Sequence, residues 1–237
     1  MGYVEESKRK WYLMAGFIGM MFCGVGDCLL AFMGEGAPYV FYGMISMNVS
    51  EVPMVLYQVS FLFGIIAAIG YLLGSKGMYS YVKDRVENKN PKLLKVYTFG
   101  AAMMSIGIFG IHAICCLAMM NIQAAVRAGL SAEAIEQYFT APDLYPFILG
   151  TTWQTVADVI VGITFIIMVC KKIVNVSKAW IVIGPLCLYV LCHIIAYILV
   201  AVTGNPSLSN FLAGGETWGL GFMFLAVRRA CDNKMGA

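Results

Sequence analysis

Charged residues are scarce in this sequence. Of its 237 residues, 60% are hydrophobic and only 12% are charged, whereas soluble globular domains carry ~25% charged residues. The apolar residues form long blocks, and the short alternating segments of an outer-membrane barrel are missing. A block of about 20 apolar residues crosses the hydrocarbon core of a bilayer as a helix. The composition therefore disfavours a soluble globular fold and predicts an all-α, polytopic membrane protein.

A cleavage site for a signal peptide is also missing. The basic cluster Lys8–Lys10 leads into a full-length apolar block, and no small-residue site follows a short one. None of the eight cysteines falls in a predicted outward segment, where oxidising conditions would pair them. The sequence therefore predicts a first span that stays in the protein and no disulfide framework.

Six apolar blocks have the length of membrane spans. Fifteen of the 16 Lys and Arg residues lie in the two terminal tails and in two alternate connections, and only Arg127 lies in the other three. Because basic loops remain in the cytoplasm, this distribution predicts one six-helix bundle over residues 1–237 with both termini cytoplasmic. The predicted spans are about 11–33, 53–75, 96–121, 145–170, 179–203 and 210–228.

The same features indicate which partners to expect. Membrane lipids surround such a bundle, and nucleic acid is not an expected partner. Glycine-rich helix faces allow close helix packing and suggest a homo-oligomer.

Five ionisable side chains fall inside the predicted spans, each on a different helix. An Asp-like charge at mid-helix costs roughly 2.5–3.5 kcal/mol, and such groups normally face a bundle interior or a water-filled cavity. With a rise of about 1.5 Å per residue, all five lie between the outer third and the midplane. The cytoplasmic helix halves carry no Asp, Glu, His, Lys or Arg until their ends, which predicts a polar cup over an apolar floor. The predicted catalytic residues are Asp27, His112, Asp158, His193 and Glu216.

Other polar and aromatic side chains accompany this layer. Gln58 and Gln154 share its depth, and Tyr197 lies one helical turn from His193. The residues predicted to bind substrate are Gln58, Trp153, Gln154, Tyr197, Asn210 and Trp218.

Three chemistries fit the five ionisable groups. Imidazoles with carboxylates match a zinc or non-haem iron site, although a close-spaced signature such as His-Glu-x-x-His is missing. Cys115 or Cys116 could add a ligand. The same groups could act as general acids and bases without a metal, or as a proton or ion relay. The predicted metal ligands are His112, His193, Asp27 and Asp158.

These groups predict a membrane-embedded enzyme, hydrolase- or isomerase-like, that acts on a lipid or another amphipathic substrate. An outward cup without a polar route through the cytoplasmic half favours this reading. A small-solute or proton-coupled transporter is one alternative, and a non-catalytic ligand-binding or structural membrane protein is another.

Three segments resemble an uncharacterised family of bacterial six-span integral membrane proteins. They are Gly26-Asp27-Cys28-Leu29-Leu30, Gly110-Ile-His112-Ala-Ile-Cys115-Cys116-Leu117-Ala118 and Gly219-Leu-Gly-Phe-Met223-Phe224. The resemblance covers most of the chain. It implies the six-span topology and a bacterial cytoplasmic membrane, and it brings no known activity.

A more local similarity concerns the Gly-Asp-x-x-Leu element at Gly26. It is similar to one in membrane lysoplasmalogenases, which hydrolyse vinyl-ether lysolipids and carry two intramembrane aspartates. This resemblance implies that Asp27 and Asp158 would take the places of those aspartates. The sequence departs from that family in its span count, six instead of about eight.

Overall fold

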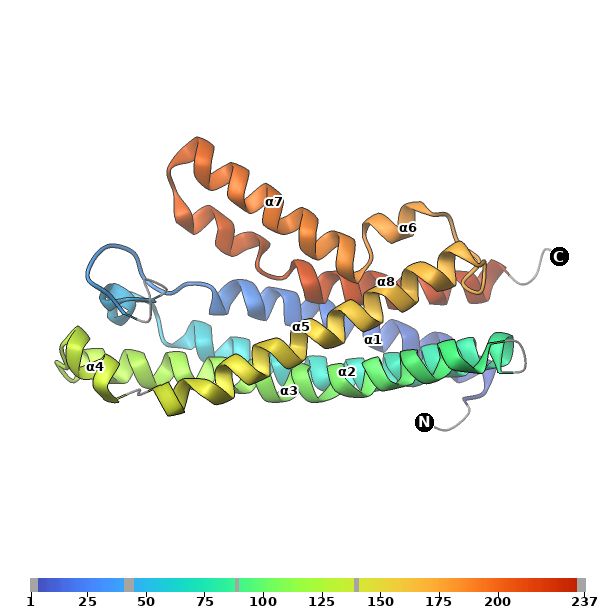
Figure 1. Cartoon of the computed structure of the whole chain (residues 1–237), viewed down its shortest axis with the longest axis horizontal. Helices are drawn as coiled ribbons and strands as arrows, with labels where there is room; N and C mark the ends of the chain where they lie inside the picture. The colour runs from blue at the N-terminus through green and yellow to red at the C-terminus, as the bar shows by residue number, and fades with distance from the viewer. Residues whose placement is uncertain (1–3, 41–44, 88–89, 139–140, 234–237) are drawn as a thin grey trace.

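The molecule is a bundle of long helices with short elements toward both ends, as the computed structural model shows (Figure 1). The structure describes residues 4–40, 45–87, 90–138 and 141–233. Its helices are α1 (Glu6–Leu30), α2 (Val55–Val86), α3 (Pro91–Arg127), α4 (Ala132–Tyr138), α5 (Ala141–Cys170), α6 (Ala179–Val182), α7 (Pro185–Thr203) and α8 (Gly215–Asp232). Two 3-10 helices, η1 (Met47–Glu51) and η2 (Pro206–Leu212), and an antiparallel pair of strands, β1 (Tyr39–Val40) and β2 (Ile45–Ser46), complete the described part. The helical class is confirmed, with a small hairpin that was not predicted.

Five of the described helices are long and apolar enough to cross a membrane. They are α1, α2, α3, the Ile148–Cys170 part of α5, and α7. This finding supports a membrane protein of several spans, whereas the predicted number of six is not confirmed.

The predicted sixth span, 210–228, differs most from the prediction. Its first residues belong to η2, and α8 begins only at Gly215. With 18 residues, α8 carries Glu216 in its first turn and Arg229 in its last. The block that hydropathy reads as one span is therefore two elements, and α8 does not qualify as a membrane-crossing helix by length and composition.

The fifth predicted span, 179–203, is also interrupted. α6 ends at Val182, Gly184 is extended, and Pro185 begins α7. Proline suits the first position of a helix because the N–H that it lacks would have no helical partner there. α7 then leans away from the other helices (Figure 1), and only 6% of its apolar window is buried.

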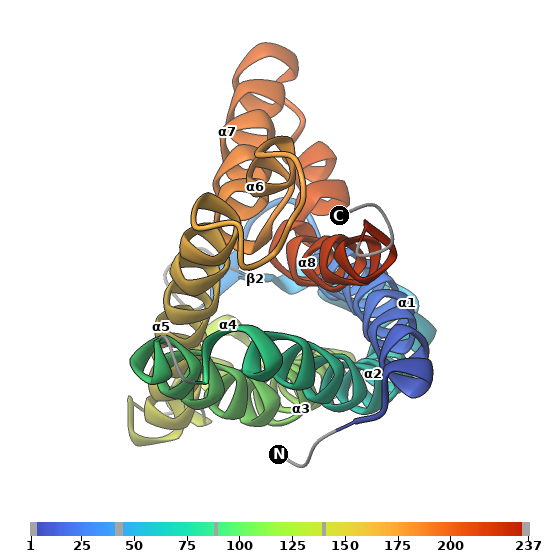
Figure 2. The same ribbon diagram turned by 90° about the vertical axis from the view of Figure 1, so that its right-hand side faces the viewer.

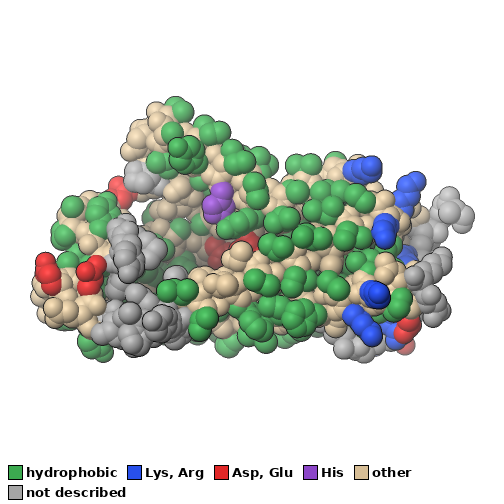
Figure 3. Space-filling view, viewed as in Figure 1, with side chains coloured by type: hydrophobic (Ala, Val, Ile, Leu, Met, Phe, Trp, Pro, Cys, Tyr) green, Lys and Arg blue, Asp and Glu red, His purple; other side chains and the backbone are tan. Residues whose placement is uncertain are grey.

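Basic side chains gather at one end of the molecule (Figure 3), and both chain termini lie at the same end (Figure 1). Buried Arg9 of α1 pairs there with Asp84 of α2 at 2.6 Å, and Lys10 pairs with Asp232 of α8 at 2.5 Å. The basic segments of the sequence thus come together at one end of the long axis of the bundle. The assignment of this end to the cytoplasm stays a prediction.

Glycines let α1 and α2 approach closely. A Cβ atom at Gly16 would lie 2.7 Å from the Cα atom of Gly74, and one at Gly19 would lie 2.9 Å from that of Gly70. Small residues at such crossings bring helix backbones into contact. These glycines thus pack α1 against α2 within one chain. In Figure 2, α1, α2 and α8 form one side of the bundle and α5 forms the other. The predicted homo-oligomer stays a prediction.

Candidate functional site

A cavity of about 290 Å³ lies between α1, α3, α5 and α8. Its polar lining comes from all four helices, with Asp27, His112, Gln154, Glu216 and Thr217. Figure 3 shows acidic side chains at the bottom of a hollow, with a histidine at its rim. The cavity therefore combines polar groups with an apolar wall. The apolar lining includes Leu30, Met33, Ile108 and Ile111.

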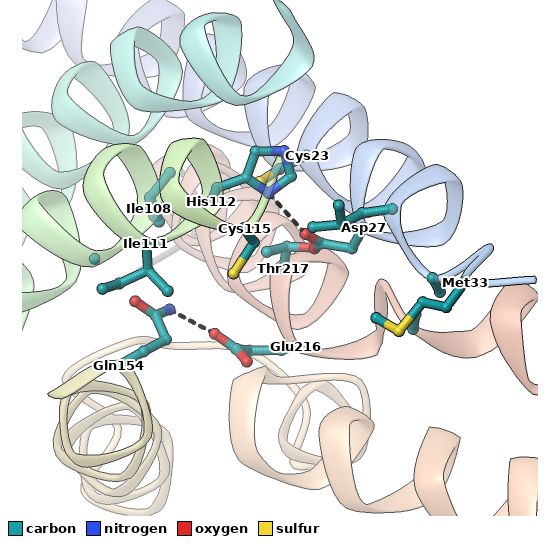
Figure 4. Close-up of a pocket in the computed structure, with 14 residues that line it drawn as sticks. Cys23, Asp27, Met33, Ile108, Ile111, His112, Cys115, Gln154, Glu216 and Thr217 are labelled. Atoms are coloured by element: carbon teal, nitrogen blue, oxygen red, sulfur yellow. Dashed lines mark hydrogen bonds and ion pairs between the residues drawn. The ribbon is translucent and has the colours of Figure 1, made fainter. Parts of the chain in front are cut away.

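His112 and Asp27 form a pair in this cavity (Figure 4). His112 Nδ1 lies 3.0 Å from Asp27 Oδ1. Gly64 of α2 provides the space for the ring, since a Cβ atom there would lie 2.5 Å from His112 Cδ2. A single proton shared between the two groups leaves the pair neutral, which reduces the cost of burying it within a membrane.

The remaining polar atoms of the pair also have partners. An N–H at His112 Nε2 donates to the Ser60 carbonyl oxygen at 2.9 Å. The Thr217 hydroxyl donates to Asp27 Oδ2 at 2.8 Å, and the Ser60 hydroxyl, 3.1 Å from His112 Nε2, donates to the Gly26 carbonyl oxygen. These bonds hold the imidazole with Nδ1 directed at Asp27.

Cys23 completes a group of three potential metal ligands. Its Sγ atom, a carboxylate oxygen of Asp27 and a ring nitrogen of His112 all lie within 4.8 Å of one another. Zinc bonds of about 2.0–2.3 Å place tetrahedral ligand atoms ~3.3–3.8 Å apart, so the three atoms could hold an ion after small shifts. A backbone carbonyl on the histidine and a hydroxyl on the carboxylate are typical outer partners of metal ligands.

This group differs from the predicted ligand set. His112 and Asp27 belong to it, Cys23 replaces a second histidine, and His193 and Asp158 lie outside it. His193 is exposed on α7, where its Nδ1 lies 3.0 Å from the Tyr189 carbonyl oxygen and its ring lies 4.3 Å from the Tyr189 ring. The spacing of four residues between Cys23 and Asp27, one helical turn, is the signal that could have identified the thiol.

The two cysteines that follow His112 lie at different places. Cys115 lines the cavity. Cys116 is buried, with its Sγ atom 3.4 Å from the Ser60 hydroxyl oxygen. Neither belongs to the group of three that could hold a metal among the described residues.

Glu216 and Gln154 lie opposite the His112–Asp27 pair (Figure 4). Gln154 Nε2 donates to Glu216 Oε1 at 2.6 Å. Glu216 lies in the first turn of α8, where the positive end of the helix dipole favours a negative charge. Asp158, one turn beyond Gln154 on α5, is 8% exposed and interacts with Glu216. Two carboxyl groups thus lie together beside the cavity.

Gln154 is the one predicted substrate-binding residue that lines the cavity. Trp153 Nε1 donates to the Met103 carbonyl oxygen at 2.9 Å instead, and Trp218 packs on Gly24 of α1. The other three lie outside because of helix rotation or helix breaks. Gln58 and Tyr197 are exposed, and Asn210 is half-buried in η2.

The chain belongs to a family of unknown function (DUF6796), whose profile matches residues 4–232. This match confirms the predicted membership of an uncharacterised family. No curated protein and no solved structure matches the chain. The bacterial source and the similarity to lysoplasmalogenases stay predictions.

Proposed function

We propose that this protein is a membrane-embedded metalloenzyme that hydrolyses or isomerises an amphipathic, lipid-like substrate. One observation carries the proposal: Cys23, Asp27 and His112 bring a thiol, a carboxylate and an imidazole together beside a cavity. This donor set suits a divalent ion such as zinc or iron. When bound, such an ion supplies Lewis acidity and lowers the pKa of a coordinated water.

The residues around the group have separate roles in this proposal. Ser60 and Thr217 orient His112 and Asp27 through the bonds at 2.9 and 2.8 Å. Glu216, across the cavity, takes up or releases a proton at the reacting group. Gln154 holds Glu216 Oε1 in place through its 2.6 Å hydrogen bond. The protein thus has a place for the ion on one side and an acid–base group on the other.

An amphipathic substrate suits the lining of the cavity. The polar groups of the cavity lie near Asp27 and Glu216, and the other walls of the cavity are apolar. Pockets for small ligands have volumes of about 300–1,000 Å³, so 290 Å³ accommodates a polar headgroup and the first carbons of a chain. The rest of an acyl chain would extend into the apolar surroundings beside α7, most of whose surface is exposed.

Metal binding tests the proposal directly. Purified protein in detergent is dialysed against Zn²⁺ and, separately, against Co²⁺, whose absorption reports thiolate ligation. We expect one ion per chain in the wild type and loss of binding in Cys23→Ser, Asp27→Asn and His112→Gln. Cys115→Ser is the matched control, because Cys115 lines the same cavity outside the group. A wild type that binds neither ion would overturn the proposal.

A second measurement separates binding from chemistry. Hydrolysis of ester-linked and vinyl-ether-linked lysophospholipids is followed in mixed micelles for the zinc-loaded protein. Glu216→Gln should keep the ion and lose turnover by about 10²–10⁴-fold, the usual contribution of a general acid or base. Full turnover in this variant would remove Glu216 from the mechanism.

A further inference from the structure

The bundle below the cavity contains polar side chains where the sequence predicted an apolar floor. Among the described residues, eight buried side-chain nitrogen or oxygen atoms have no hydrogen-bond partner. One of them, on Gln123, lies near η1, where Gln123 Nε2 donates to the Val49 carbonyl oxygen. The other seven belong to residues that extend from the cavity to the basic end. They are Gln154 Oε1, Asp158 Oδ1, the Tyr71 hydroxyl, Ser75 Oγ, the Tyr97 hydroxyl, the Tyr81 hydroxyl and Arg9 Nε.

The first part of this row joins the cavity to the middle of the bundle. Asp158 interacts with Glu216, which lines the cavity. On its other side, Asp158 interacts electrostatically with Tyr71 of α2. The side chain of Tyr71 is 0% exposed and Asp158 is 8% exposed, so this interaction acts through the interior of the protein.

The middle of the row is a group of three hydroxyls from two helices. Tyr71 and Ser75 lie one turn apart on α2, and Tyr97 comes from α3. Both tyrosines interact with the Ser75 side chain, and all three residues are 0% exposed. None of the three hydroxyls forms a hydrogen bond of normal distance and angle among the described atoms. The three hydroxyls therefore lie close together without a well-formed hydrogen bond between them.

The last part reaches the basic end. Tyr81 lies six residues beyond Ser75 on α2, a rise of ~9 Å. Its side chain interacts with Arg9, Arg85 and the backbone of Asn175. Arg9 in turn pairs with Asp84 at 2.6 Å. Polar groups thus recur between Glu216 and the basic end, with a step of ~9 Å along α2 from Ser75 to Tyr81.

Such an arrangement is costly unless the hydroxyls are bonded. A buried polar group without a partner costs about 1–3 kcal/mol, and folded proteins retain only a few. Internal water molecules are the usual partners of buried polar groups that cannot reach one another. Rows of carboxyl and hydroxyl groups within membrane helices are also typical of proton relays.

We propose that Asp158, Tyr71, Ser75, Tyr97 and Tyr81, with water molecules between them, form a proton path from Glu216 to the basic end. At each step a hydroxyl or a water accepts a proton on one lone pair and releases another to the next oxygen. Rotation of the hydroxyls and water molecules then restores their starting orientation, so every group is unchanged after one proton has passed. The path requires no oxidant, no reductant and no metal, so it stands independently of the proposed metal site.

Proton flux into liposomes tests this path. Purified protein is reconstituted with a pH-sensitive dye inside, and a potassium diffusion potential drives protons across the membrane. We expect protein-dependent flux in the wild type. Tyr97→Phe and Ser75→Ala should each slow it about tenfold, because each removes one hydrogen-bonding link of the path.

Tyr57→Phe is the matched control. Tyr57 is a buried tyrosine of α2, the helix that carries Ser75, but its hydroxyl donates to the Phe32 carbonyl oxygen away from the row. Its flux should equal that of the wild type. Wild-type flux no higher than that of protein-free liposomes would overturn the proposal, and so would path variants that conduct like the wild type.

Two readouts separate this inference from the proposed metalloenzyme. Tyr97→Phe should still bind one zinc ion per chain, because Tyr97 does not line the cavity. His112→Gln should lose the ion and retain the flux. Two substitutions within the row, at Tyr97 and at Ser75, keep the test valid if one variant does not fold.

Discussion

Two buried polar regions of this bundle differ in how their atoms are partnered. In the first, His112 and Asp27 have a partner for each ring nitrogen and each carboxylate oxygen. In the second, the hydroxyls of Tyr71, Ser75 and Tyr97 lie close together, but none forms a hydrogen bond of normal distance and angle among the described atoms. The first arrangement holds side chains in one geometry, which suits ion binding. The second leaves donors and acceptors for water, which suits proton movement.

The largest expected effect comes from breaking the fully bonded region. His112→Ala removes one partner of a buried pair and should destabilise the protein by about 3–5 kcal/mol. Thermal or denaturant unfolding in detergent measures the change. The double variant Asp27→Ala with His112→Ala should cost less than the sum of the single changes, because no unpaired charge then remains. Additive costs would contradict the pairing.

A methyl group placed against the imidazole should have the next largest effect. In Gly64→Ala the new Cβ atom would lie 2.5 Å from His112 Cδ2, so the ring must leave Asp27 or Ser60, at a cost of about 1–3 kcal/mol. Gly110→Ala is the matched control, since a Cβ atom there meets nothing within 4 Å. In the control, alanine should stabilise its helix by about 0.5–1 kcal/mol. The same unfolding assay compares the two, and equal effects would show that the fit around His112 is loose.

The hydroxyl region should respond less, and the sign of its response is informative. If water bonds the Tyr97 hydroxyl, Tyr97→Phe should destabilise the protein by about 0.5–1.5 kcal/mol. If the hydroxyl has no partner at all, its removal should stabilise the protein. A rise in the unfolding midpoint of Tyr97→Phe would therefore count against the water-filled row.

The smallest effect is expected at the surface of the basic end, where the Lys10–Asp232 pair is exposed. A hydrogen bond from Lys10 lowers the pKa of the Asp232 carboxyl below its usual value. The pair therefore stabilises the fold above the unfolded pKa of about 3.9, and the contribution is lost as the pH falls through the folded pKa. Asp232→Asn should cost at most ~0.5 kcal/mol at pH 7. Unfolding of both proteins between pH 7 and pH 3 should show that small difference shrink as the pH falls below about 3.9, and a larger cost at pH 7 would make the pair structurally important.

Much of the site could be predicted from single residues, because an ionisable side chain in an apolar block is conspicuous. Asp27, His112 and Glu216 were predicted in this way, and all three line the cavity. His193 was equally conspicuous, yet it faces outward on α7. Hydropathy gives the depth of a side chain but not the direction in which its helix turns it.

Other residues were missed because their side chains are common in membrane helices. From the sequence, Cys23 is interpreted as a small packing residue and Tyr97 as an aromatic residue at the end of a span, and no prediction concerns Tyr71 or Ser75. Their importance depends on neighbours from other helices. Cys23 meets His112 across 89 positions of the chain, and Ser75 meets Tyr97 from the adjacent helix. No local pattern contains that information.

The sequence by itself determined the helical class, the apolar segments long enough to cross a membrane and the basic end. These properties follow from composition and charge along the chain, which local hydropathy and loop charge report directly. Only the tertiary structure decided that Pro185 and Gly215 begin new helices, that Cys23 joins Asp27 and His112, and that hydroxyls line the route below them. Those outcomes depend on the rotation and breaks of each helix, which are set by packing between segments far apart in sequence.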